Sequence, residues 1–166
     1  MLHTHAIVPN AVTCNQQGEA LMTDLFGDEA LWVPYTDPGL PLARTIHELR
    51  EAHVARTGGP APRITFMGDH GIIVSADTVA QIAELNEHVM ATVTGYAEQR
   101  IQQINQRIMS FTRLVEIIQR FELYPELKDK WTTEEIVAKM KEDTIMEPVS
   151  AEIVDKRTGR PTTAMI

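Results

Sequence analysis

Two short apolar segments near the middle of the chain constrain the fold more than any other feature of the sequence. Residues 63–67 and residues 72–74 are mostly apolar, and a Gly-Asp-His-Gly segment separates them. Because glycine and aspartate favour tight turns, the two segments are predicted to be strands of a β-hairpin with His70 at its tip. Asp77 follows and is predicted to cap a helix. This strand–turn–strand–helix unit indicates a mixed α/β fold.

The helix after this unit is predicted to be long, running from about residue 78 to residue 121. Its first half carries one apolar stripe, which its second half continues in alternating steps of three and four residues, the spacing of a coiled coil. The residues of the stripe are Ile82, Leu85, Val89, Val93, Ala97, Ile101, Ile104, Ile108, Phe111, Val115 and Ile118. Two interpretations stay open: the helix packs on the hydrophobic core, or the stripe is a contact between copies of the chain.

The segments before the hairpin predict shorter helices and strands. Strands are predicted at residues 2–8 and 30–35, and helices at residues 8–16, 18–26 and 42–54. Pro34 indicates that the second strand ends there or lies at a sheet edge, because proline cannot donate a hydrogen bond to a neighbouring strand. Together with the hairpin and the long helix, these elements are assigned to one domain, residues 1–121.

The last part of the chain, residues 122–166, is predicted to be a helical and irregular extension. Thr132 and Glu135 have the spacing of a capping box, which predicts a helix over residues 132–141. Residues 149–154 are predicted to form a strand, and the Thr-Gly-Arg-Pro segment beyond it is predicted to be a turn.

Composition limits the classes of protein to which the chain can belong. The 166 residues fit a domain with a hydrophobic core, since 43% are hydrophobic and 23% are charged. The net charge of −8 provides no basic surface for nucleic acid, and no apolar run approaches the length of a membrane span. The single cysteine, Cys14, excludes an intrachain disulfide and is predicted to be a buried small residue. The start of the chain lacks the regions of a signal peptide, so a cytoplasmic location is predicted.

Three histidines are the candidate metal ligands. His3 and His5 are two residues apart near the start of the chain, and residues i and i+2 of a strand point to the same face. His70, at the tip of the hairpin, can supply a third imidazole from a neighbouring strand end. Three imidazoles with an open position form the ligand set of catalytic zinc. The alternatives are a frayed, exposed terminus for His3 and His5, and a turn residue without a ligand role for His70.

The other candidate residues have simpler interpretations. Tyr35 is either an aromatic residue of the core or sheet edge, or a residue close to a substrate. His47, His53 and His88 lie on predicted helices and are interpreted as surface residues. Four acidic residues around the second helix are interpreted as a solvated face or as caps, namely Glu19, Asp24, Asp28 and Glu29.

Three segments of the chain follow the order and spacing of motifs in a known family. Residues 3–6, His-Thr-His-Ala, resemble a His-x-His zinc motif that precedes a helix. Residues 31–39, Leu-Trp-Val-Pro-Tyr-Thr-Asp-Pro-Gly, with Leu-Ala at 42–43, resemble the segment that opens the family's next helix. Residues 66–74 resemble its hairpin with the third zinc ligand. Over about residues 2–95 the sequence thus resembles the class II aldolase/adducin family, which includes fuculose-, rhamnulose- and ribulose-phosphate enzymes.

The resemblance implies a layered α/β/α domain with a central, mainly antiparallel sheet, assembled as a homo-oligomer. It implies that His3, His5 and His70 bind Zn²⁺, or Mn²⁺ or Co²⁺ in its place. The implied activity is that of a lyase of carbohydrate metabolism, which cleaves a small sugar or sugar phosphate by retro-aldol chemistry through a zinc-stabilised enediolate. Tyr35 is then a candidate catalytic residue. The alternatives are an epimerase or decarboxylase of the same family, or a non-catalytic, adducin-like relative that acts in assembly.

One departure from the family pattern concerns proton transfer. Upstream of His-x-His, the family's enzymes carry their early strands, phosphate-binding loops and the glutamate that acts as acid and base. The sequence here begins two residues before the motif, so the resemblance implies an N-terminally truncated fold with only the metal half of an active site. Asp69 also stands where many relatives have an amide, and it could support a metal ligand. A second polypeptide that supplies the missing portion is a further possibility.

Overall fold

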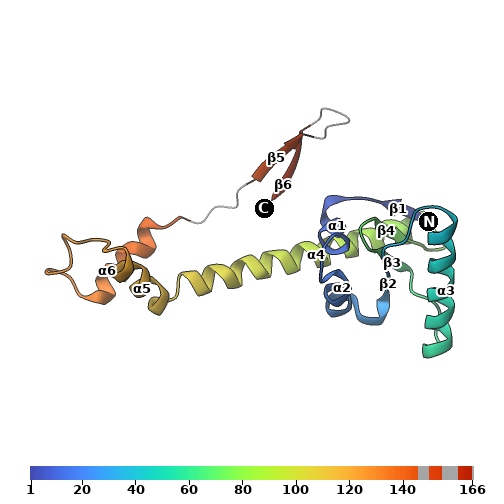
Figure 1. The fold of residues 1–166 in the computed structure, drawn as a ribbon, viewed down its shortest axis with the longest axis horizontal. Helices are drawn as coiled ribbons and strands as arrows, with labels where there is room; N and C mark the ends of the chain where they lie inside the picture. The colour runs from blue at the N-terminus through green and yellow to red at the C-terminus, as the bar shows by residue number, and fades with distance from the viewer. Residues whose placement is uncertain (146–149, 155–160, 166) are drawn as a thin grey trace. The chain divides into compact units, whose positions relative to one another are not determined.

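The computed structural model describes residues 1–145, 150–154 and 161–165, and Figure 1 shows its helices and strands. Contacts within the chain divide it into two compact units, Met1–Ala97 and Glu98–Ile166. The described residues form six α-helices and two small sheets, so the fold is mixed α/β as predicted. None of the described helices is long and apolar enough to cross a membrane.

The first unit is built on a four-stranded sheet with the strand order β1-β4-β3-β2. Its strands are β1 (Leu2–Thr4), β2 (Ala30–Val33), β3 (Ile64–Met67) and β4 (Gly71–Val74). β3 and β4 form the predicted hairpin, in which Met67 lies opposite Gly71. β1 pairs antiparallel with β4 and β2 pairs parallel with β3, so the sheet is mainly antiparallel. β2 ends before Pro34 and lies at the sheet edge, as the proline predicted.

The helices predicted before the hairpin are all present. They are α1 (Ile7–Thr13), α2 (Gly18–Phe26) and α3 (Leu40–Thr57). A short 3₁₀ turn, η1 (Gly27–Glu29), connects α2 to β2. α3 ends at Thr57, and the capping residue Gly58 has a left-handed φ of 69°, a conformation that glycine adopts more readily than other residues. Gly58 therefore ends this helix.

Helices cover both faces of the sheet, which produces three layers. Successive side chains of a strand point to opposite faces, and Phe66 of β3 packs on one face while Met67 packs on the other. The face of Phe66 is covered by α1, α2 and the first part of α4 (Val79–Ile108), and the face of Met67 is covered by α3. All four residues of β3 are buried, because the strand is covered from both sides. The layers of the first unit are thus helix, sheet and helix.

The start of α4 differs from the prediction, because Thr78 and not Asp77 caps it. The Gln81 N–H donates to Thr78 Oγ1 over 3.2 Å, and the Thr78 N–H donates to Gln81 Oε1 over 3.3 Å. These reciprocal contacts form a capping box. The Asp77 carboxylate instead accepts from Arg63 Nη2 over 2.9 Å. The residue predicted to cap the helix therefore forms an ion pair with the first strand of the hairpin.

The long helix is interrupted, so the prediction of one helix from residue 78 to residue 121 was wrong. α4 ends at Ile108, and α5 occupies Phe111–Arg120. Ser110 lies between them with an extended backbone (φ −66°, ψ 145°), and its hydroxyl donates to the Arg107 carbonyl over 2.9 Å. A serine side chain that bonds a nearby carbonyl competes with the helix ladder. The apolar spacing does not reveal this break, because it continues across it.

The second unit contains α5 and α6 (Thr133–Asp143). Leu114, Ile136 and Val137 are its described buried apolar residues. The capping box predicted for α6 is present, since the Glu135 N–H donates to Thr132 Oγ1 and Glu135 Oε2 accepts from the Thr132 N–H over 2.7 Å. The predicted helix over residues 132–141 is therefore confirmed.

Two strands near the end of the chain, β5 (Ser150–Val154) and β6 (Pro161–Met165), pair antiparallel. β5 confirms the strand predicted at 149–154 from residue 150 onward, whereas residue 149 lies outside the described residues. The sequence did not predict β6. Of the predicted Thr-Gly-Arg-Pro turn, residues 158–160 lie outside the described residues.

Candidate metal centre

The structure brings together the three histidines that the sequence indicated. One ligand nitrogen from each of His3, His5 and His70 lies within 4.8 Å of the others, so the cluster could hold a metal ion. The ring centroids are separated by 4.7 Å for His3 and His5, 5.2 Å for His3 and His70, and 4.9 Å for His5 and His70. We call these residues the three-histidine cluster. His3 and His5 are exposed and His70 is half-buried, so the cluster is open to solvent.

The β-ladder and a neighbouring carbonyl orient His3. The residue lies in β1 opposite Ile73 of β4, and its Nδ1 is 2.9 Å from the Ile72 carbonyl oxygen. A carbonyl only accepts hydrogen bonds, so Nδ1 carries a proton, and in the neutral ring this tautomer leaves the lone pair on Nε2. A metal-binding histidine commonly donates its other N–H to a carbonyl or carboxylate in this way.

The His5 ring lies close to both the His3 ring and Gly71. His5 Nε2 is 2.9 Å from His3 Nε2, and because the His3 nitrogen accepts, the His5 nitrogen donates. A metal ion bound between the two nitrogens would replace this shared proton. A Cβ atom on Gly71 would lie 2.6 Å from His5 Cδ2 and 2.5 Å from the Thr4 carbonyl oxygen. Only glycine at position 71 therefore lets the His5 ring occupy its place.

Three consecutive amides hold the turn that carries His70. They belong to Gly68, Asp69 and His70, and they donate to the carbonyls of Val33, Thr13 and Met67 over 2.8, 2.8 and 3.1 Å respectively. These acceptors belong to β2, α1 and β3. Asp69 has a left-handed backbone (φ 51°), which is uncommon for a residue with a Cβ atom and persists where its surroundings hold it. The position of His70 is therefore set by three other elements of the first unit.

The electrostatics of the cluster favour a neutral His70. Burial is the main cause that lowers the pKa of its imidazole, and the neighbouring His5 and His3 lower the pKa further, since each disfavours a second positive charge. A lowered pKa leaves the ring nitrogen unprotonated near neutral pH. Metals bind the neutral form of histidine, so this environment suits a ligand.

Tyr35 is an exposed residue beside this turn and not part of the core. Tyr35 lies two residues after the end of β2 and is 61% exposed. Its hydroxyl donates to Asp37 Oδ1 over 3.4 Å. Its main-chain nitrogen would lie 3.1 Å from a Cβ atom on Gly68, so the residue adjoins the turn that carries His70. Of the alternatives for Tyr35, the core position is therefore wrong, whereas a place just after the edge strand β2 with a hydrogen-bonded hydroxyl agrees with the structure. A position near a substrate stays a prediction.

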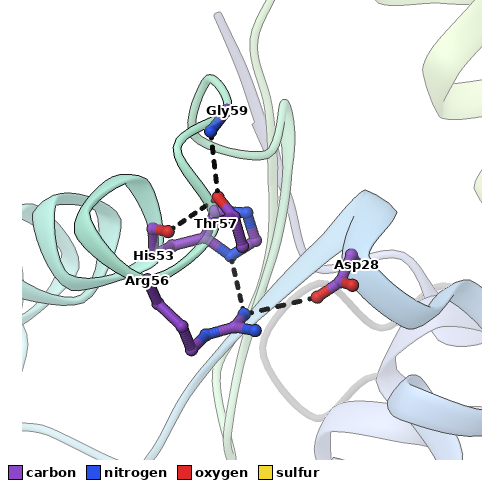
Figure 2. Close-up of polar contacts among 5 residues, drawn as sticks. All are labelled: Asp28, His53, Arg56, Thr57 and Gly59. Atoms are coloured by element: carbon purple, nitrogen blue, oxygen red, sulfur yellow. Dashed lines mark hydrogen bonds and ion pairs between the residues drawn. The ribbon is translucent and has the colours of Figure 1, made fainter.

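The interpretation of His53 as a surface residue was also wrong, because the residue is buried (8% exposed). Figure 2 shows its contacts. Its Nδ1 accepts from Arg56 Nη2 over 3.3 Å, and the same guanidinium pairs with Asp28 Oδ1 of η1 over 3.3 Å. Arg56 thereby joins the end of α3, beside the His53 ring, to the turn after α2. His47 and His88 are exposed, as predicted.

Cys14 was predicted to be buried, and the structure shows it exposed. α1 ends at Thr13, and its buried residues are Pro9, Val12 and Thr13. Cys14 is the next residue and caps the end of this helix, outside its buried face. The single thiol therefore lies at the surface.

Sequence reasoning missed three residues that support the cluster, namely Asn10, Thr13 and Gly71. Asn10 and Thr13 lie three positions apart on α1, so they share a helix face directly after His5. The signal was present in the polar character of both residues on a helix that is otherwise mostly apolar. The requirement for glycine at position 71 had no such signal, because it depends on the ring of His5, far away in the sequence.

The chain is similar to the protein named Uncharacterized oxidoreductase YuxG from Bacillus subtilis (strain 168), with 25% identity over 101 residues. The match covers 61% of this chain and 14% of that protein, so the chain spans a small part of this relative's length. No family model and no solved structure matches the chain.

Proposed function

We propose that the three-histidine cluster is a divalent metal centre and that the protein is a class II aldolase-like lyase acting on a small sugar or sugar phosphate. The observation that carries the proposal is that three imidazole nitrogens lie within 4.8 Å of one another. They belong to a residue of β1, a residue just after β1 and a residue of the hairpin turn. Residues distant in the sequence are held in this arrangement by backbone hydrogen bonds, which favours a preformed binding site.

The chemistry of the donors fits zinc. Three neutral imidazoles with an open position form the ligand set of catalytic zinc, and imidazole also suits other transition metals such as cobalt. The His3 Nδ1–H bond to the Ile72 carbonyl supplies the outer contact that orients a metal-binding ring. We therefore propose Zn²⁺ as the metal, with Mn²⁺ or Co²⁺ as substitutes.

The exposed side of the cluster suits a small polar substrate. A bound zinc ion would act there as a Lewis acid for the negative charge that develops on a hydroxy-ketone when a neighbouring carbon–carbon bond breaks. His3, His5 and His70 would hold the ion and leave a position open to solvent. Tyr35, with its hydroxyl bonded to Asp37, is the proposed proton-transfer residue among those beside the turn.

The fold of the first unit supports the same family. A layered arrangement of helices around a mainly antiparallel sheet is what the class II aldolase resemblance implies, and the hairpin carries its histidine at the expected place. The word oxidoreductase in the relative's name describes the whole of that protein, of which the match covers 14%. That name therefore does not favour one reaction for this chain.

A role in assembly is the second candidate function, and one surface favours it. Four large apolar residues of α4 and α5 are exposed at steps of three and four, namely Ile101, Ile104, Ile108 and Phe111. Exposed apolar surface of this kind is typical of contacts between proteins. In this case the protein would form a stable homo-oligomer and would not cleave any aldol donor.

Elemental analysis of the purified chain tests the metal centre. We expect about one zinc, manganese or cobalt ion per chain, lost in His70→Ala and retained in His88→Ala, which removes an exposed histidine outside the cluster. A chain that binds no metal after incubation with Zn²⁺ would contradict the proposal. If metal is bound, turnover of phosphorylated and free ketoses, followed by aldehyde release, separates the lyase from the assembly role.

A further inference from the structure

His5 is the histidine of the cluster that regular secondary structure constrains least. β1 ends at Thr4 and α1 begins at Ile7, so His5 lies in the connection between them. His3, in contrast, is held in the ladder opposite Ile73. A contact outside the ladder must therefore set the path of the backbone at His5.

The side chain of Asn10 makes this contact. Its Nδ2 donates to the His5 carbonyl over 3.3 Å, and its Oδ1 accepts from the Thr13 hydroxyl over 3.3 Å. The two partners define the orientation of the amide, because the carbonyl can only accept and a hydroxyl can donate to Oδ1. Asn10 therefore ties the connection after β1 to the body of α1.

Thr13 extends the chain of contacts to the other side of the cluster. The residue is 2% exposed, and its carbonyl accepts from the Asp69 N–H over 2.8 Å. Asp69 precedes His70 and has the left-handed backbone described above. A continuous path thus joins the His5 carbonyl, the Asn10 amide, Thr13 and the turn that carries His70.

We propose that Asn10 is a positioning residue that holds His5 in register with the turn of His70. Its role in metal affinity rests on the metal centre proposed above, whereas its effect on the histidines of the metal-free protein does not. Contacts behind metal ligands typically change affinity by about 10- to 100-fold. Loss of the Asn10 contact is expected to have an effect in this range, although Asn10 is not a ligand.

Two variants isolate the contact. Asn10→Asp keeps the shape of the side chain and an acceptor for Thr13, but it cannot donate to the His5 carbonyl. Asn10→Leu is of similar size and uncharged, and it removes both hydrogen bonds. Asn105→Ala, on α4 in the second unit, is the matched control. Thermal melts followed by circular dichroism of the metal-free chains identify any variant that does not fold, in which case the other carries the comparison.

Competition with a chromophoric chelator measures the Zn²⁺ affinity of each chain. We expect the affinity to fall about tenfold or more in both Asn10 variants and to stay unchanged in the control. An affinity in Asn10→Leu equal to that of the wild type would overturn the positioning role while leaving the metal centre intact.

Imidazole ¹H–¹⁵N spectra of the metal-free protein provide a readout that does not depend on metal. The wild type should show protonated Nδ1 for His3 and a His5 Nε2–H held against His3, as the hydrogen bonds require. In Asn10→Asp the His5 signals should shift to those of an exposed ring that averages between tautomers. Unchanged His5 signals would overturn the proposal. If the wild type binds no Zn²⁺, the metal centre is wrong and these spectra alone decide the role of Asn10.

Discussion

The two units of the chain differ in how many of their large apolar residues they bury. In the first unit, the sheet is covered by helices on both faces, and Phe66 at its centre is 0% exposed. Among the described residues of the second unit, eight large apolar residues are exposed, namely Ile101, Ile104, Ile108, Phe111, Phe121, Leu123, Trp131 and Ile145. The first unit also exposes six large apolar residues, but it buries thirteen apolar residues, against three in the described part of the second unit. The first unit therefore contains its own core, whereas the second leaves more of its apolar residues at the surface, which is typical of a contact with another molecule.

Phe66→Ala should produce the largest effect, because it removes an aromatic ring from the centre of the first unit. We expect the free energy of unfolding to fall by about 3–5 kcal/mol, measured by urea denaturation. Phe121→Ala is the matched substitution in the second unit, where the residue is 62% exposed. Its cost is expected to stay within about 0.5 kcal/mol. A cost for Phe121→Ala comparable to that of Phe66→Ala would show that this surface is covered and would break the comparison.

Metal removal should affect the first unit alone. At a free Zn²⁺ concentration about 100 times the dissociation constant, binding stabilises the folded state by about 2.7 kcal/mol. Hydrogen exchange with Zn²⁺ or with a chelator should show the difference at amides of β1, β4 and the His70 turn. Protection in α5 and α6 should stay the same. An equal change in both units would mean that the metal binds elsewhere or that the units unfold together.

Gly71→Ala should disturb the site more than the fold. The added methyl group meets the Thr4 carbonyl and the His5 ring, and such overpacking costs about 1–3 kcal/mol. We expect Zn²⁺ affinity to fall together with the thermal midpoint. Gly95→Ala is the matched control, because a Cβ atom there meets nothing within 4 Å. That variant should gain about 0.5–1 kcal/mol in stability, since glycine is unfavourable inside a helix, and should keep its Zn²⁺ affinity.

The smallest effect is expected at the start of α6 in the second unit. Hydrogen bonds from the Thr132 backbone and then from its hydroxyl lower the pKa of Glu135 in the folded chain. A lowered carboxyl pKa stabilises the folded state above the unfolded value of about 4.3, and this contribution is lost as the pH falls through the lower, folded value. The amide signal of Glu135 should therefore shift in acid, at a pH below the unfolded value. Glu135→Gln keeps a capping acceptor and removes the titration, so a shift that persists in this variant would contradict the assignment.

Sequence reasoning succeeded where a feature depends on residues close together in the chain. The Gly-Asp-His-Gly segment predicted the hairpin that carries His70, and Thr132 with Glu135 predicted the start of α6. Pro34 predicted the end of an edge strand. Each signal acts within four residues, through turn conformation, a capping contact or a missing donor, so it is complete in the sequence itself.

The predictions failed where the outcome depends on contacts between distant residues, or where two adjacent residues could each cap the same helix. Cys14 and His53 were assigned the wrong burial, because what covers a helix is decided by other elements. The cap of α4 moved from Asp77 to Thr78 because Arg63, in the strand before, pairs with the aspartate. The break at Ser110 was hidden because an apolar stripe records which face a residue occupies and not whether the backbone stays helical.

The sequence by itself determined the identity of three candidate ligands and the local conformation of the turn that carries His70. Tertiary structure alone decided that they meet. His3 reaches the Ile72 carbonyl across 69 positions of the chain, and the pairing of β1 with β4 sets the register that makes this possible. Gly71 and the path from Asn10 to Asp69 then place the His5 ring. The direction of an imidazole depends on the backbone beneath it and on partners that pack against it, and no local segment contains both.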